Sequence, residues 1–68
     1  MKMKANRKKL KLAMARACMN TADLVKKSAM PRPTVNSVII GRDVRPATIG
    51  KIARALDVDV TDILEVEE

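Results

Sequence analysis

Residues 20–41 read NTADLVKKSAMPRPTVNSVIIG and decide the fold of this chain of 68 residues. Two segments of this stretch have apolar residues at helical spacing, and an interruption that contains proline separates them. The asparagine that opens the stretch is suited to cap a helix, because its side chain accepts from the free N–H groups of the first turn. The pattern predicts one helix over Thr21–Ser28 and a second that begins at Arg32 or Pro33 and is ended by Gly41.

The second predicted helix has a buried side and an outward side. Val35, Val38 and Ile39 share one face by the i, i+3, i+4 rule, and we expect them to pack inward. With Arg32 at the tip, the opposite face carries Pro33, Asn36, Ser37 and Ile40. Two short helices held at a steep angle across a tight turn form a helix-turn-helix, which is the motif that this stretch predicts.

The composition favours an all-α domain. A chain this short buries only roughly 60% of its extended surface. It has no Phe, Tyr or Trp, so smaller apolar residues must fill the interior, and closely packed short helices allow this more readily than sheets. Helical spacing predicts further helices over about Arg7–Ala17 and Ala47–Leu56. Asp59 is suited to cap a fifth helix that would end at Leu64.

The chain divides into a basic arm over residues 1–9 that runs into the first helix, a helix-turn-helix domain over residues 10–64, and an acidic tail over residues 65–68. The arm has five basic residues and no acid, so we expect it not to pack. The first turn of the first helix would contain Arg7, Lys8 and Lys9. Positive charge there opposes the helix dipole by roughly 0.3–1 kcal/mol per residue, and either a DNA phosphate or water would offset it.

Charge is distributed unevenly along the chain. Residues 1–54 hold all 14 Lys and Arg against only Asp23 and Asp43, a net charge of +12, whereas residues 55–68 hold six acids and no base. A basic body suggests a nucleic acid as partner, because each neutralised phosphate releases counterions and adds affinity that does not depend on sequence. A solvated surface that keeps a small protein in solution is the alternative.

Several functional classes are excluded by residue types that the chain lacks. One cysteine, Cys18, and no histidine exclude an internal disulfide, a zinc-finger ligand set and a Cys-His or Ser-His catalytic pair. We expect Cys18 to be a small buried residue at a helix end. The apolar runs are far shorter than a membrane span, and the N-terminus lacks a signal-like apolar region. We expect a cytoplasmic protein that is not an enzyme and needs no cofactor and no metal.

Short motifs recur along most of the chain. In order they are Leu10-Lys11-x-Ala13, Asp23-Leu24, Thr34-Val35, Gly41 and Pro46-x-Thr48-Ile49-x-Lys51-Ile52-Ala53-x-Ala55-Leu56-x-Val58. Together they resemble the Xre/Cro type of phage-repressor-like helix-turn-helix proteins, and the last motif is the most specific. The resemblance covers Leu10 to Leu64 and implies an all-α, five-helix DNA-binding fold.

The resemblance also implies which residues meet DNA. The positions that face bases or adjacent phosphates are Arg32, Pro33, Asn36 and Ser37. Arg32 is the expected base reader, because a guanidinium fork matches O6 and N7 of guanine. The helix that begins at Arg32 or Pro33 is the recognition helix of the motif. The expected phosphate contacts are Thr21 at the start of the preceding helix, Arg42 and Arg45 in the loop after the recognition helix, and Lys8 and Lys9 in the arm.

Three positions depart from the pattern of the family. Ala29 stands where a glycine is usual in the turn, so a left-handed backbone there would cost about 1 kcal/mol unless the turn differs. Val25 replaces a small alanine between the two helices of the motif. Met14 and Ile39 stand where many members pair an arginine with a glutamate, and we predict that these two apolar side chains touch.

The leading hypothesis is a sequence-specific regulator of transcription that binds double-stranded DNA, acts as a repressor and is a homodimer at least on DNA. Apolar side chains near Val60 and Val66 are the expected dimer surface by analogy with the family. The alternative is an antitoxin-like protein-interaction module whose acidic end binds a basic toxin. Binding of single strands is disfavoured, because it normally uses aromatic stacking platforms and the chain has none.

Overall fold

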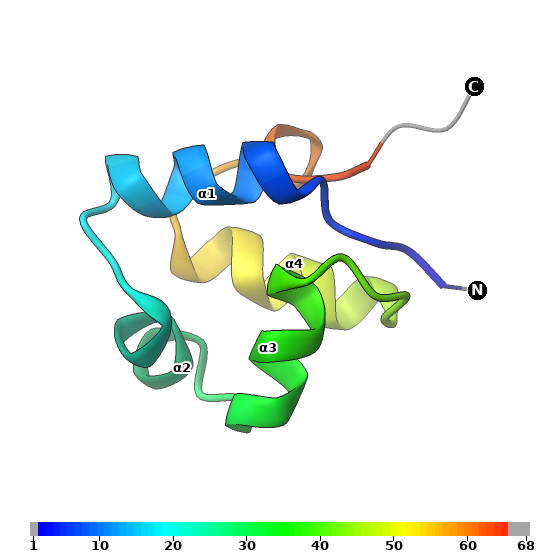
Figure 1. Cartoon of the computed structure of the whole chain (residues 1–68), viewed down its shortest axis with the longest axis horizontal. Helices are drawn as coiled ribbons and strands as arrows, with labels where there is room; N and C mark the ends of the chain where they lie inside the picture. The colour runs from blue at the N-terminus through cyan, green and yellow to red at the C-terminus, as the bar shows by residue number, and fades with distance from the viewer. Residues whose placement is uncertain (1, 66–68) are drawn as a thin grey trace.

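The computed structural model describes residues 2–65 as a small bundle of helices (Figure 1). Its elements are α1 (Arg7–Arg16), α2 (Thr21–Ser28), α3 (Arg32–Ile39), α4 (Pro46–Ala55) and the 3-10 turn η1 (Val60–Asp62). Within the described residues no β-strand forms, and two isolated bridges are the only extended pairings. The predicted all-α class is confirmed. The prediction of a fifth α-helix is wrong, because the described chain forms only the single turn η1 at that place.

The core lies where α4 meets the other elements. α4 contacts α2, α3 and η1, and it buries Ile49 and Ile52 completely. The largest side chains with almost no exposed surface come from each of the four α-helices and from the segment that follows η1: Leu10, Leu24, Val35, Val38, Ile49, Ile52 and Ile63. No polar or charged residue is buried in the described part of the chain. The core is therefore aliphatic and carries no polar network that would need internal partners.

The N-terminal segment packs against the domain, contrary to the expectation for residues 1–9. Met3 exchanges two backbone hydrogen bonds with Val44, at 2.8 and 2.7 Å, and Ala5 is only 2% exposed. Ala5 also forms a bridge with Leu64. In the sequence Lys-Met-Lys-Ala the apolar residues alternate with lysines, and an extended segment with this alternation turns its apolar residues to one side. We call residues 3–6 the N-terminal strap.

The strap also explains why the fifth helix is only one turn long. Asp59 caps η1 by accepting from the N–H of Thr61 at 3.0 Å, as the sequence predicted for a helix start. Three positions beyond η1, however, the N–H of Glu65 donates to the carbonyl oxygen of Lys4 at 2.9 Å. Pairing with the strap replaces the hydrogen bonds that would continue a helix. Of the expected acidic tail only Glu65 is described, and Val66 lies outside the described residues.

The cap of η1 is sensitive to pH. The backbone hydrogen bond from Thr61, followed by the bond from its hydroxyl, lowers the pKa of Asp59 below its ordinary value. A carboxyl whose pKa is lower in the folded state stabilises the fold above the pKa of the unfolded chain, and this contribution is lost as the pH falls through the folded pKa. The turn is therefore weakened in acid.

Among residues 2–65, four have a left-handed backbone, and only one of them is a glycine. Besides Gly41, with φ +83°, they are Cys18, Ala29 and Asp57, with φ between 55° and 57°. Each lies at or just beyond the end of a helix, where a left-handed residue lets the last carbonyls be satisfied. Of the two outcomes left open for Ala29, a left-handed backbone or a different turn, the structure shows the left-handed backbone. Cys18 is exposed rather than buried, because it stands in the position that follows the end of α1.

The strain at Ala29 predicts a stabilising substitution. Ala29→Gly should raise the free energy of unfolding by about 1 kcal/mol, because glycine has no Cβ to clash in the left-handed region. Ala15→Gly, the same change at an exposed position inside α1, should lower it by about 1 kcal/mol. Urea denaturation of the two variants measures both effects, and changes of the same sign would contradict the conformation of Ala29.

Gly50 lies within α4 but has no packing reason to be glycine. A Cβ built on Gly50 meets nothing within 4 Å, whereas one on Gly41 would approach Cγ of Arg7 at 3.3 Å. Gly50→Ala should therefore raise the free energy of unfolding by roughly 1 kcal/mol through helix propensity. Gly41→Ala should lower it, because its backbone is left-handed. A thermal melt in which both substitutions act alike would refute this distinction.

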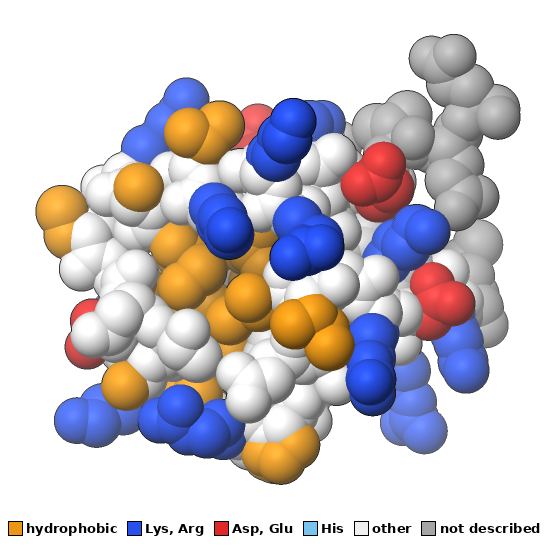
Figure 2. Space-filling view, in the orientation of Figure 1, with side chains coloured by type: hydrophobic (Ala, Val, Ile, Leu, Met, Phe, Trp, Pro, Cys, Tyr) orange, Lys and Arg blue, Asp and Glu red, His pale blue; other side chains and the backbone are white. Residues whose placement is uncertain are grey.

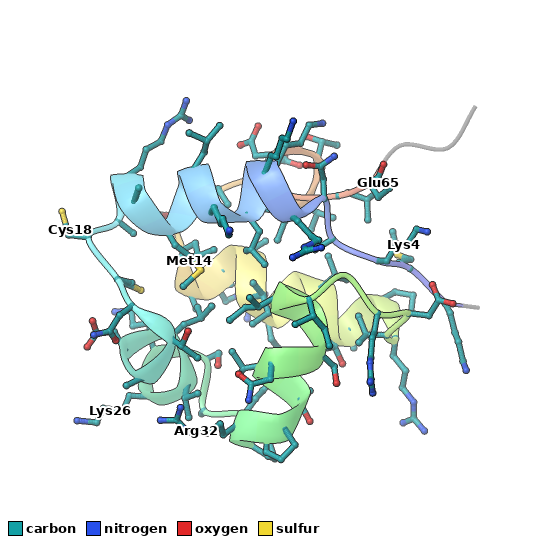
Figure 3. The ribbon with its side chains drawn as sticks, viewed as in Figure 1. Lys4, Met14, Cys18, Lys26, Arg32 and Glu65 are labelled. Carbon is teal, nitrogen blue, oxygen red and sulfur yellow. The ribbon has the colours of Figure 1, made fainter. Side chains whose placement is uncertain are left out.

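Met14 and Ile39 are both half-buried and both pack against the core. Figure 3 shows Met14 pointing from α1 into the space between the helices. Their direct contact stays a prediction, which a double-mutant cycle tests. Met14→Arg should destabilise the fold by about 2 kcal/mol, because it places an unpaired charge against apolar side chains, and Ile39→Glu added to it should restore part of the loss. Melting temperatures without such rescue would show that the two positions are not neighbours.

Candidate nucleic-acid interface

A reciprocal cap fixes the start of α2. The side chain of Asn20 accepts from the N–H of Asp23 at 2.8 Å, and the carboxylate of Asp23 accepts from the N–H of Asn20 at 3.1 Å. Leu24 is completely buried one turn into the helix. The observed bounds, Thr21–Ser28, confirm the predicted helix. Thr21 is therefore the first residue of α2, half-buried, with the positive end of the helix dipole beside it.

The turn between α2 and α3 is held by one buried side chain. Met30 is 8% exposed and packs in the core, directly after the left-handed Ala29. Pro31 then opens α3, since its carbonyl oxygen accepts from the N–H groups of Thr34 and Val35, both at 3.1 Å. The buried Met30 thus anchors the turn to the core between the end of α2 and the start of α3.

The two faces of α3 are separated as the sequence predicted. Val35 and Val38 are completely buried, whereas Arg32, Pro33 and Asn36 are exposed. Figure 3 shows Arg32 at the start of α3, at the lower edge of the molecule. These exposed side chains share one side of a helix that protrudes from the bundle.

Ser37 is less available than its place on the outer face suggested. It is half-buried, and its hydroxyl donates to the carbonyl oxygen of Pro33 at 3.0 Å. The hydroxyl oxygen therefore keeps lone pairs for a donor on DNA, but its proton is already used. Ile40, on the same side of α3, is 50% exposed and adds an apolar surface at the far end of the helix.

The loop after α3 is held at its centre. Gly41 and Arg42 donate backbone hydrogen bonds to the carbonyl oxygens of Val38 and Ser37, at 3.1 and 2.9 Å, which ends the helix. Val44 is half-buried and paired with Met3 of the strap. Arg42 and Arg45, on either side of Val44, are exposed. The loop therefore presents both arginines from a fixed backbone.

Basic side chains surround α3, but not all of the predicted ones lie near it. Lys9 lines a surface hollow with Thr61 and Asp62, on the side of α1 that faces η1. Lys8 is exposed. The structure therefore does not bring Lys9 together with the outer face of α3.

Arg7 and Lys11 are two basic residues on the other side of α1 that the sequence analysis did not assign to a site. The alkyl stem of Arg7 lies over Gly41, at the end of α3. Lys11 follows Arg7 by one helical turn, and Met14 completes the series at i, i+4, i+7. Figure 2 shows basic side chains in the middle of the viewed face, over α1, with an apolar area beside them. In the sequence, the spacing of Arg7 and Lys11 from Met14 is the feature that indicates that all three side chains share one face of α1.

A comparison with protein families identifies the chain. The Cro/C1-type HTH DNA-binding domain matches residues 9–68. The chain belongs to this family. No curated protein and no solved structure matches the chain. The Cro/C1-type match covers α1 from Lys9 onward and every later element, whereas the N-terminal strap and Arg7 precede it.

The described part of the chain offers neither a metal site nor a membrane-spanning helix. Residues 2–65 contain no cluster of three or more histidine, cysteine or acidic side chains arranged to bind a metal ion. None of the helices in this part of the chain combines the length and the apolar character that crossing a bilayer requires. The outer face of α3 and the loop after it therefore remain the candidate functional surface of this Cro/C1-type domain.

Proposed function

We propose that this Cro/C1-type protein is a sequence-specific regulator of transcription that inserts α3 into the major groove of double-stranded DNA. The observation that carries the proposal is the division of α3, whose inner side is completely buried while its outer side bears exposed Arg32 and Asn36. An α-helix with free polar side chains fits the major groove, where each base pair offers a distinct pattern of donors and acceptors. Repression, by occupying the site, is the proposed mode of regulation.

The base-reading roles follow from the chemistry of the outer face. Arg32 is assigned to guanine, because its fork can donate two hydrogen bonds to O6 and N7. Asn36 is assigned to adenine or a nearby phosphate. Pro33 offers methylene groups to a thymine methyl or a sugar, and Ser37 offers an acceptor, since its proton is held by the backbone. With so few direct contacts, DNA shape should supply part of the specificity.

The proposed phosphate contacts are Thr21, Arg42 and Arg45. Thr21 lies at the start of α2, where backbone N–H groups and the helix dipole favour an anion. Arg42 and Arg45 extend from the loop that the strap holds. The expected contact from Lys8 stays a prediction, whereas the position of Lys9 beside η1 argues against its expected contact.

A homodimer on DNA is part of the proposal. Recognition helices of a helix-turn-helix dimer read half-sites about 34 Å apart. The chain has one such helix and extends only 31 Å along its longest axis, so one copy does not reach two half-sites. Two copies related by a twofold axis would double the number of contacts and match a palindromic site.

The antitoxin-like alternative has less support. Two of the acids near the C-terminal end, Asp59 and Asp62, form the cap of η1 and have a structural use. Glu65 accepts from the side chain of Asn6 at 3.0 Å. Purification from the native host would separate the two functions, because a toxin partner would elute with the protein.

Substitutions of two arginines test the division of roles. Arg32→Ala should reduce the difference in binding free energy between the preferred and a random duplex by about 1–3 kcal/mol, because it removes a base contact. Arg45→Ala should weaken binding to both duplexes alike and reduce the slope of log K against log[salt] by about 1. After selection of the preferred site from random DNA, gel-shift titrations at several salt concentrations measure both quantities. Equal losses of discrimination in the two variants would contradict the assignment.

A further inference from the structure

We infer that Arg7 and Lys11 of α1 form a second phosphate-binding element, which grips the DNA backbone beside the end of α3. The inference rests on the proposed function and extends it to residues outside the helix-turn-helix. Its ligand is the phosphodiester backbone of the duplex that α3 reads, and its contribution is independent of base sequence.

Arg7 is placed by contact with the recognition helix. A Cβ built on Gly41 would lie 3.3 Å from Cγ and 3.5 Å from Cδ of Arg7, so the stem of the arginine crosses the backbone where α3 ends. A side chain at Gly41 would push the stem away. The guanidinium is therefore carried to the junction between α3 and the loop that bears Arg42 and Arg45.

The backbone beneath Arg7 is held on both sides. Asn6 accepts from the N–H of Lys9 at 3.0 Å and caps α1. The N–H of Asn6 donates to the carbonyl oxygen of Ile63 at 2.7 Å, and its side-chain amide donates to Glu65 at 3.0 Å. Arg7 thus extends from a fixed helix start, which limits the entropy lost when its side chain meets a ligand.

The charged groups of Arg7 and Lys11 are not paired with other groups in the described part of the chain. No hydrogen bond or ion pair joins the side chain of Arg7 or of Lys11 to any other described residue, and both side chains are exposed. The first turn of α1 holds no acid, so Arg7 opposes the dipole of its own helix. A phosphate at this position would offset the repulsion and would be attracted by both charges.

A structural role for Arg7 is the competing explanation. The last turn of α3 has no basic residue, and the charge of Arg7 stands near the negative end of that dipole. This role would change stability without changing how DNA binding depends on salt. Lys11 lies one turn along α1 on the same side, and a role for Arg7 at the end of α3 does not account for this second exposed charge.

The test compares two substitutions that remove the same charge from the same helical turn. Arg7→Gln should weaken binding of the full chain to the preferred and the random duplex alike, by about threefold to tenfold per bound copy, and reduce the salt slope by about 0.9 per copy. Lys9→Gln, on the opposite side of α1, should leave both unchanged. Arg7→Lys should retain most of the slope, and Lys11→Gln should lower it as Arg7→Gln does.

Four results would overturn the inference. A slope unchanged in Arg7→Gln, with a lower melting temperature, would assign Arg7 to the dipole of α3. Equal losses in Arg7→Gln and Lys9→Gln would show that only net charge matters. If the unsubstituted chain binds no duplex at low salt, the proposed function fails and the inference with it, whereas normal binding by Arg7→Gln removes the inference alone.

Discussion

The burial of one side of α3 is the constraint on which the interface depends. α3 has only eight residues, and a helix of this length is not stable alone in water. Val35 and Val38 lose all their exposed surface in the core, and complete burial of such a side chain contributes roughly 1.5–3 kcal/mol. The same packing that forms the helix turns its other side outward. Folding and the presentation of Arg32 and Asn36 are therefore one event.

Local chemistry explains how much of this could be predicted from the sequence. Caps, prolines and apolar spacing act within a few residues, so they placed α2 at its observed bounds and α1 and α4 within one residue of theirs at each end. The outer face of α3 followed from the same spacing. The left-handed backbone of Ala29 was one of two outcomes left open, because the family usually has glycine at that position and a different turn was the alternative.

Long-range pairing was the part that the sequence did not reveal. Asn6 and Glu65 stand 59 positions apart, and nothing in either segment by itself indicates the other. The basic charge of the strap suggested a free arm, although Met3 and Ala5 alternate with lysines as in a half-buried extended segment. The prediction of a fifth helix was wrong because of another long-range pairing, since the N–H of Glu65 donates to the carbonyl oxygen of Lys4. The role proposed for Arg7 likewise depends on where Gly41 lies relative to α1, which the helical register of Arg7 with Lys11 and Met14 does not show.

The strap connects the loop after α3 with the start of α1 and with the segment that follows η1. Met3 holds Val44 at the centre of the loop, and Asn6 is held by Ile63 and Glu65, so the loop, the start of α1 and the C-terminal segment form one connected unit. Each of the three pieces is too short to be ordered alone. Because they fix one another, the basic side chains that they carry lose less conformational entropy on meeting DNA than they would on free segments. The affinity of the interface should therefore depend on backbone pairing remote from the recognition helix as well as on the residues that touch the duplex.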